Sequence, residues 1–259
     1  SAAAPEQDEP DAPDEPEEPS EPEKPAAAYT QSDVQNVRIA GTSGYEPDVS
    51  ALLLEHPLRL DLSREGPKVL IIHTHASEAY TPSPGWEYEA SDTLRTEDTA
   101  RSVVRVGDAI AEALEARGIG VVHDREIRDY PSYNGSYQRS RKTVEQYLAE
   151  YPSIRVVLDI HRDAIVSGDT VTAPSAEIEG KSAAQIMIIS GCDDGTMDYP
   201  NYGENLQFSI ALQEQLEGMY PGLTRPILFD YRLYNQDLTT GSILIEVGGH
   251  GNTLEEACY

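Results

Sequence analysis

From residue 68 onward, short apolar runs alternate with segments in which apolar residues recur every three to four positions. The run 69–72 holds no polar residue, which is typical of a strand buried on both faces. In 100–117 the apolar residues recur at helical spacing, and Gly118 follows in the position of a C-terminal cap. The same patterns predict further strands at 119–122, 154–160, 186–189 and 243–247, and further helices at 137–151 and 204–219.

This order of strands and helices predicts an α/β fold, with a mainly parallel, twisted sheet flanked by helices. In open sheets of this kind, ligands bind beyond the carboxyl ends of the strands. We therefore expect the functional residues of this chain to lie where its predicted strands end.

The first 25 residues differ in composition from the rest of the chain. Prolines recur at every third position from Pro10 to Pro25, and ten carboxylates stand against a single lysine. A period of three matches polyproline II, and repulsion between like charges extends it, so residues 1–28 are predicted to be a disordered acidic tether. Residues 29–66 are interpreted as a linker and lead-in, and residues 67–259 as one folded domain.

The chain carries 46 Asp and Glu against 19 Lys and Arg, a net charge of −27. Surfaces that hold phosphates need clustered Lys and Arg, so we expect neither nucleic acid nor anionic lipid as the main partner. The longest apolar runs are far shorter than the ~20 residues that cross a bilayer. Because the chain starts at Ser1 and opens into the tether, we expect a membrane anchor upstream in a longer parent protein.

Ionisable residues stand where three of the predicted strands end. His75 and Glu78 form an H-x-x-E after the first strand, and His161 follows another. Two imidazoles and one carboxylate, with a fourth position left to water, are the ligand set of a catalytic zinc site. Zinc lowers the pKa of its water toward about 7, and a neighbouring carboxylate can take the remaining proton. Glu246, in the last strand, is predicted to be that base.

Other interpretations of these residues stay open. An H-x-x-E occurs often by chance, and histidines at strand ends are frequently bound by backbone groups instead of metals. Cys192 follows a strand and could form a nucleophile pair with His161, although nothing near it in the sequence supports this. Cys192 and Cys258 fit no metal pattern and are expected to be free thiols. The sequence contains no G-x-S-x-G elbow, phosphate-binding loop or dinucleotide fingerprint.

Four segments carry a family resemblance: 69–75 with Glu78 and Tyr80, 104–108, 159–163, and 245–249 with 252–256. In order and spacing they resemble the stage II sporulation protein P family. The resemblance implies a fold similar to the zinc-dependent N-acetylmuramoyl-L-alanine amidases. It implies a membrane-anchored, extracytoplasmic peptidoglycan hydrolase that cleaves the amide between glycan and stem peptide, and peptide cross-links, during engulfment of the forespore. It also implies sporulation proteins D and M as partners.

Carried over residue by residue, His75 and His161 match the family's metal histidines. Glu246 matches the glutamate that related amidases use as catalytic base. The third ligand has two candidates, because Glu97 occupies the place before the helix where related amidases carry their acidic ligand. The H-x-x-E spacing favours Glu78 over Glu97. The alternatives to an amidase are a non-catalytic wall-binding scaffold and a zinc carboxypeptidase that trims stem peptides.

Four further residues are candidates for substrate binding or for support of the ligands. His73 is expected to point to the opposite face of the sheet from His75, in a packing or hydrogen-bonding role. Arg162 could bind a substrate carboxylate, or form an ion pair with Asp163. Tyr133 and Tyr137, together with Tyr130, could line a groove for glycan or peptide, although packing on the domain's own surface is the more frequent outcome for loop aromatics.

Overall fold

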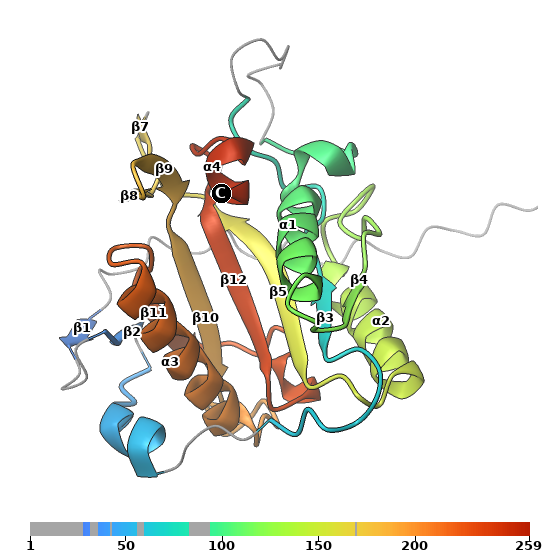
Figure 1. The fold of residues 1–259 in the computed structure, drawn as a ribbon, viewed down its shortest axis with the longest axis vertical. Helices are drawn as coiled ribbons and strands as arrows, with labels where there is room; N and C mark the ends of the chain where they lie inside the picture. Colours follow the sequence, from blue (N-terminus) through green and yellow to red (C-terminus); the bar gives the residue numbers. More distant parts are fainter. Residues whose placement is uncertain (1–27, 32–35, 42, 56–59, 83–93, 169) are drawn as a thin grey trace, which may run out of the picture.

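An eight-stranded sheet with helices on both faces forms the centre of the molecule (Figure 1). The computed structural model describes residues 28–31, 36–41, 43–55, 60–82, 94–168 and 170–259. The predicted α/β class is confirmed. No helix of these described segments is long and apolar enough to cross a membrane.

The strands follow the spatial order β1-β2-β11-β10-β12-β5-β3-β4. Two neighbouring pairs, β1 with β2 and β10 with β12, are antiparallel, and the other five pairs are parallel. The sheet is therefore mainly parallel, as predicted. Its strands are β1 (Ala28–Gln31), β2 (Arg38–Gly41), β3 (Val69–Ile72), β4 (Val121–His123), β5 (Val156–Asp163), β10 (Ile186–Cys192), β11 (Ile227–Tyr231) and β12 (Ser242–Gly249).

The helices divide between the two faces of the sheet. Helices α1 (Val103–Glu115) and α3 (Tyr202–Met219) share the larger core with one face of β3, β5 and β12. Helix α2 (Ser136–Glu150) packs on the other face, where Val144 meets Leu70 and Ile72 of β3. Alternate residues of a strand point to opposite faces of the sheet. Val69 and Ile71 therefore belong to the larger core, whereas Leu70 and Ile72 face α2.

The helix predicted at 100–117 is shorter than expected, because the chain before it makes a separate turn. Residues Thr99–Arg101 form the 3-10 turn η2, and the Ser102 side chain then accepts the Val104 N–H as the N-cap of α1. Gly118 follows the helix with φ +79°, in the left-handed region that favours glycine, as its expected role as a cap requires.

The sheet begins earlier in the chain than the sequence predicted. Strands β1 and β2 come from 28–41, within the segment interpreted as linker and lead-in, and they extend the sheet beyond β11. The interpretation of 29–66 as a linker is therefore corrected for these strands. The predicted tether at 1–28 lies outside the described residues except for Ala28, the first residue of β1.

Two small hairpins and several short helical elements complete the fold. Both hairpins lie in 166–184, where the sequence pattern predicted no strand or helix. The last helix, α4, is fixed by a capping box between Thr253 and Glu256. Cys192 and Cys258 are free, as predicted. The remaining elements are β6 (Val166–Ser167), β7 (Thr170–Val171), β8 (Ser175–Ile178), β9 (Lys181–Ala184), η1 (Ala51–Glu55), η3 (Gln236–Leu238) and α4 (Leu254–Cys258).

We expect Gly107→Ala to destabilise the fold, although alanine ordinarily favours a helix by about 1 kcal/mol. A Cβ at Gly107 would lie 2.5 Å from His123 Nε2 and 2.6 Å from His73 Nε2. These rings contact each other at 2.8 Å, so relieving the overlap means moving groups in the interior, at a cost of about 1–3 kcal/mol. Denaturant unfolding measures the loss. The matched control is Gly203→Ala in α3, where an added Cβ meets nothing within 4 Å; equal stability of both variants would contradict the prediction.

Candidate active site

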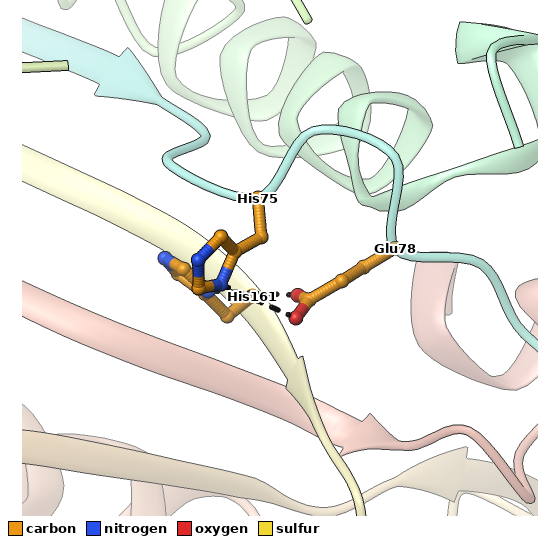
Figure 2. A group of neighbouring side chains, drawn as sticks. All are labelled: His75, Glu78 and His161. Atoms are coloured by element: carbon orange, nitrogen blue, oxygen red, sulfur yellow. Dashed lines mark ion pairs between the residues drawn. The ribbon is translucent and has the colours of Figure 1, made fainter. Parts of the chain in front are cut away.

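The predicted site residues come together at the carboxyl ends of β3, β5 and β12. Figure 2 shows His75 and Glu78 on the loop after β3, facing His161 on β5. Each of the three can offer one ligand atom such that all three atoms lie within 4.8 Å of one another. All three residues are buried. The structure therefore assembles two imidazoles and one carboxylate into a cluster that could bind a metal ion.

Two of the separations within this cluster are close to those of ligands around a small cation. His75 Nδ1 lies 3.5 Å from Glu78 Oε1, and His161 Nδ1 lies 3.5 Å from Glu78 Oε2. Two ligands bound tetrahedrally to zinc at 2.0–2.1 Å lie about 3.3 Å apart. The two nitrogen–oxygen separations are therefore close to those of a zinc site, and the three ligand atoms together lie within 4.8 Å of one another.

The charges around the cluster also favour a cation. Burial opposes the charge on Glu78, but His161 and His75 beside it hold the pKa of this carboxyl well below its usual value. Burial likewise opposes a charge on His161, yet Asp159 and Glu78 raise the pKa of this imidazole well above its usual value. Two buried carboxylates around one ring create a place for positive charge, which a metal ion supplies without a proton.

The Nε2 atoms of both histidines, which are not the ones nearest Glu78, lie close to polar side chains of the protein. His161 Nε2 lies 2.9 Å from Asp159 Oδ1, and His75 Nε2 lies 3.1 Å from Ser136 Oγ at the start of α2. Asp159 is itself fixed, because it accepts hydrogen bonds from the Thr74 N–H at 2.8 Å and the Thr74 hydroxyl at 2.6 Å. A carboxylate behind a metal-binding histidine orients the ring and makes the coordinating nitrogen more basic.

We expect Asp159→Asn to weaken zinc binding by about 10–100-fold, because the amide removes the negative charge behind His161 but keeps the side-chain shape. Competition with a chromogenic chelator measures this affinity, and circular dichroism checks the fold. Asp163→Asn is the control on the same strand, since Asp163 pairs with Arg225 instead. Unchanged affinity in Asp159→Asn would show that this carboxylate has no role in metal binding.

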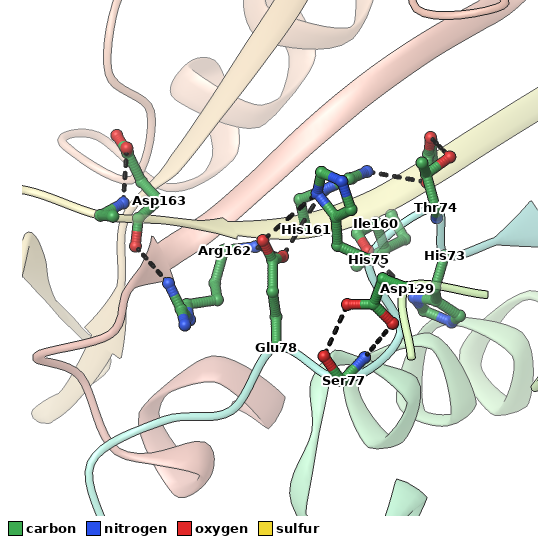
Figure 3. Close-up of polar contacts among 12 residues, drawn as sticks. His73, Thr74, His75, Ser77, Glu78, Asp129, Ile160, His161, Arg162 and Asp163 are labelled. Carbon is green, nitrogen blue, oxygen red and sulfur yellow. Dashed lines mark hydrogen bonds and ion pairs between the residues drawn. The ribbon is translucent and has the colours of Figure 1, made fainter. Parts of the chain in front are cut away.

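Contacts from several segments fix Glu78 in place. Its Oε2 accepts the Arg162 backbone N–H at 3.1 Å, and Arg95 Nη2 lies 3.8 Å from its Oε1. The turn before it is held by Asp129, which accepts both the N–H and the hydroxyl of Ser77 (Figure 3). Arg95 also donates to Asp129 at 2.7 Å. The loop after β3 is thus tied to β5 and to the 124–130 segment.

Glu246 stands beside the cluster in β12, where it is the register partner of His161 in the neighbouring parallel strand. Its Oε2 is buried and has no hydrogen-bond partner among the residues described. Burial raises the pKa of Glu246 to about 8, Glu78 and Asp163 add to this, and His161 opposes it. A buried carboxylate that holds its proton near neutral pH is suited to proton transfer, and a cation at the cluster would favour its ionised form.

The two candidates for the third ligand are separated by the structure. Glu78 is buried inside the cluster with His75 and His161. Glu97 is exposed and does not belong to this group. The expectation that favoured Glu78 therefore agrees with the geometry, and its role as a metal ligand remains a proposal.

His73 points away from His75, as expected, but for a different reason. Residues that are two positions apart on one continuous strand point to the same face of the sheet. Strand β3 ends at Ile72, however, and the chain turns after it. The His73 ring lies 2.9 Å from the Ile160 carbonyl oxygen (Figure 3). Its Nε2 lies 2.8 Å from His123 Nε2. Burial lowers its pKa to about 4, with His123 as the next cause, so the ring is neutral.

Arg162 binds backbone groups of the loop that follows β3. The residue is 6% exposed, and its guanidinium donates to the backbone carbonyls of Ala79 at 2.8 Å and Leu94 at 3.0 Å. Asp163 instead pairs with Arg225 at 2.9 Å. Arg162 therefore binds the loop that carries Glu78, and its contact with a substrate carboxylate stays a prediction.

Two of the three predicted groove tyrosines contact the candidate ligands. The Tyr133 ring stacks on His75 with centroids 4.4 Å apart, and Tyr137 meets His75 edge-on at 5.5 Å. Arg95 lies over the Tyr133 ring, 4.8 Å from its centroid. Tyr133 and Tyr130 are 50% and 57% exposed. Aromatic surface therefore borders the cluster on the side of α2.

Sequence patterns missed three residues of the site. Asp159 could have been found, because it lies two positions before His161 on one strand and must share its face. Asp129 and Arg95 gave no signal, since they lie in irregular segments whose positions depend on tertiary packing. Both matter to the geometry, because they hold Ser77 and approach Glu78.

Comparison with known proteins places the chain in a family. The family model for stage II sporulation protein P matches residues 2–259. The chain belongs to this family. It is 34% identical over 199 residues to stage II sporulation protein P of Bacillus subtilis (strain 168), a match that covers 73% of this chain and 47% of the relative. The chain thus spans about half the length of that relative.

Two solved amidase structures are similar in arrangement at low identity. The N-acetylmuramoyl-L-alanine amidase AmiC2 of Nostoc punctiforme is 15% identical with a TM-score of 0.36, over 74% of this chain and 85% of that one. The CwlD amidase from Clostridioides difficile, solved in complex with the GerS lipoprotein, is 11% identical with a TM-score of 0.38, over 74% and 86%. Because both the identities and the TM-scores are low, the assignment of the site depends on the residues of this chain alone.

Proposed function

We propose that this chain is a zinc-dependent peptidoglycan hydrolase that cleaves the amide between the glycan lactyl group and the first residue of the stem peptide. One observation carries the proposal: His75, Glu78 and His161 form a buried ligand set, and Glu246 lies beside them on the same sheet edge. Membership of the sporulation family supports peptidoglycan as the substrate.

His75, Glu78 and His161 would hold the zinc ion, which when bound would polarise the scissile carbonyl and acidify a water molecule. Glu246 takes the proton of the attacking water and returns it to the leaving amine. One water is consumed, the carbon–nitrogen bond breaks, and a lactyl carboxylic acid and a free amino terminus are released. Asp159 and Ser136 keep the two imidazole rings in orientation throughout.

The biological setting is part of the same proposal. Family membership supports action outside the cytoplasm during engulfment, by a membrane-anchored protein. Sporulation proteins D and M are the proposed partners. Cleavage of peptide cross-links is a second proposed activity of the same site.

Digestion of purified sacculi, followed by mass spectrometry of the released fragments, tests the proposed reaction. An amidase releases intact stem peptides with new amino termini, and removal of the metal by a chelator abolishes the release. Release of single terminal residues would instead indicate a carboxypeptidase. Binding to sacculi without any new amino termini would contradict hydrolysis and favour the scaffold.

A further inference from the structure

Tyr137 packs against both candidate metal histidines. It stands in the first turn of α2, and its ring lies parallel to His161, with centroids 6.5 Å apart and an interplanar angle of 9°. Its ring also meets His75 edge-on at 5.5 Å and stacks on Tyr234 at 5.0 Å. The Tyr137 backbone carbonyl accepts from Asn235 at 3.0 Å. A ring held on three sides keeps its hydroxyl in one place relative to the site.

No hydrogen bond links the hydroxyl of this tyrosine to another described residue, and its oxygen is not among the buried side-chain atoms without a partner. Three other phenols of the chain have a protein partner: Tyr80 donates to the Val247 carbonyl, Tyr147 to Asp124, and Tyr199 contacts Gln236. Phenols in protein interiors ordinarily find such a partner. The Tyr137 hydroxyl is therefore available to a group that enters the site from outside.

The carboxylates of Glu78, Asp159 and Glu246 around the two histidines supply only hydrogen-bond acceptors when they are ionised. The Tyr137 phenol adds a hydrogen-bond donor beside them. An incoming carbonyl oxygen, which only accepts hydrogen bonds, complements this arrangement.

We propose that the Tyr137 hydroxyl donates a hydrogen bond to the carbonyl oxygen of the scissile amide and stabilises the negative charge that develops there. The inference rests on the proposed function and adds a catalytic residue to it. Tyr137 keeps its proton throughout, so the balance of the hydrolysis is unchanged. A donor fixed in advance where charge develops costs no reorganisation during the reaction, and removing one such donor typically slows catalysis about 10²–10³-fold.

Kinetics of Tyr137→Phe on a soluble muramoyl-peptide, with the zinc-loaded full chain, test this role. The variant keeps the ring and its stacking and removes only the oxygen. We expect kcat to fall about 10²-fold with KM and zinc content unchanged. Affinity for a phosphinate that replaces the scissile amide by a tetrahedral centre should fall by a similar factor. Tyr151→Phe, which removes a half-buried phenol at the other end of the same helix, is the control and should match the unmodified chain.

The outcomes separate this inference from the proposed function. Full activity and full phosphinate affinity in Tyr137→Phe, with an active unmodified chain, would overturn the role of Tyr137 alone. A rise in KM without a change in kcat would also overturn it, because the hydroxyl would then bind the ground state and the transition state equally. An unmodified chain that neither hydrolyses the substrate nor binds the phosphinate would overturn both proposals.

Discussion

Replacing Glu246 by Gln is expected to leave zinc binding intact and to slow amide hydrolysis by about 10²–10⁴-fold. The substitution preserves size and hydrogen bonding but removes the ability to accept a proton from water. Glu246 lies outside the ligand cluster and beside His161, so its loss should affect proton transfer without affecting the metal. Hydrolysis of sacculi and metal analysis of the purified variant measure the two properties separately.

The control for this prediction is Glu112→Gln, which changes the same side chain at a position that is 72% exposed on α1. It should retain both zinc and activity. If Glu246→Gln hydrolysed sacculi at the rate of the unmodified chain, the assignment of Glu246 as the base would be wrong. Loss of zinc from Glu246→Gln would instead place this residue among the ligands.

Replacing His161 by Ala is expected to abolish both metal binding and hydrolysis. The variant removes one of the three ligands and leaves the buried carboxylates of Glu78 and Asp159 without their imidazole partner. In the unmodified chain, zinc at about 100 times its Kd should raise the free energy of unfolding by about 2.7 kcal/mol. His161→Ala should show no such increase. Thermal unfolding with and without added zinc measures the difference.

His250→Ala serves as the matched control, because His250 follows the last strand and lies outside the ligand cluster. It should retain the stabilisation by zinc. A His161→Ala protein that gained as much stability from zinc as the unmodified chain would exclude His161 as a ligand. His75→Ala provides a second variant of the cluster in case His161→Ala folds poorly.

The strands of the central sheet were predicted best where the sequence is an unbroken run of apolar residues. Residues 69–72 are buried on both faces in the structure, so an unbroken apolar run was a reliable signal for strand β3. Strand β11 (Ile227–Tyr231) was missed because Asp230 interrupts a very short apolar run. The hairpin of β8 and β9 was missed for another reason: its turn places Glu179 at φ +49°, a conformation that the residue type does not indicate.

The candidate ligands could be predicted because each lies at or just after a strand end, where the topology of a parallel sheet brings side chains together. The contacts that support these ligands could not be predicted from the sequence. Arg95 reaches Glu78 from a segment 17 residues away, and Asp129 reaches Ser77 from one more than 50 residues away. No local pattern specifies such contacts, because they depend on how loops pack against one another. Arg162 shows the same limit, since its buried contacts to Ala79 and Leu94 depend on the path of a loop.

Anomalous diffraction at the zinc absorption edge, from crystals of the zinc-loaded protein, tests the central claim most directly. The account predicts one strong peak, bounded by the imidazole nitrogens of His75 and His161 and the carboxylate of Glu78, with Glu246 beside it. A protein that binds zinc stoichiometrically but shows its peak elsewhere, or shows none between these three residues, would contradict the assignment of the site.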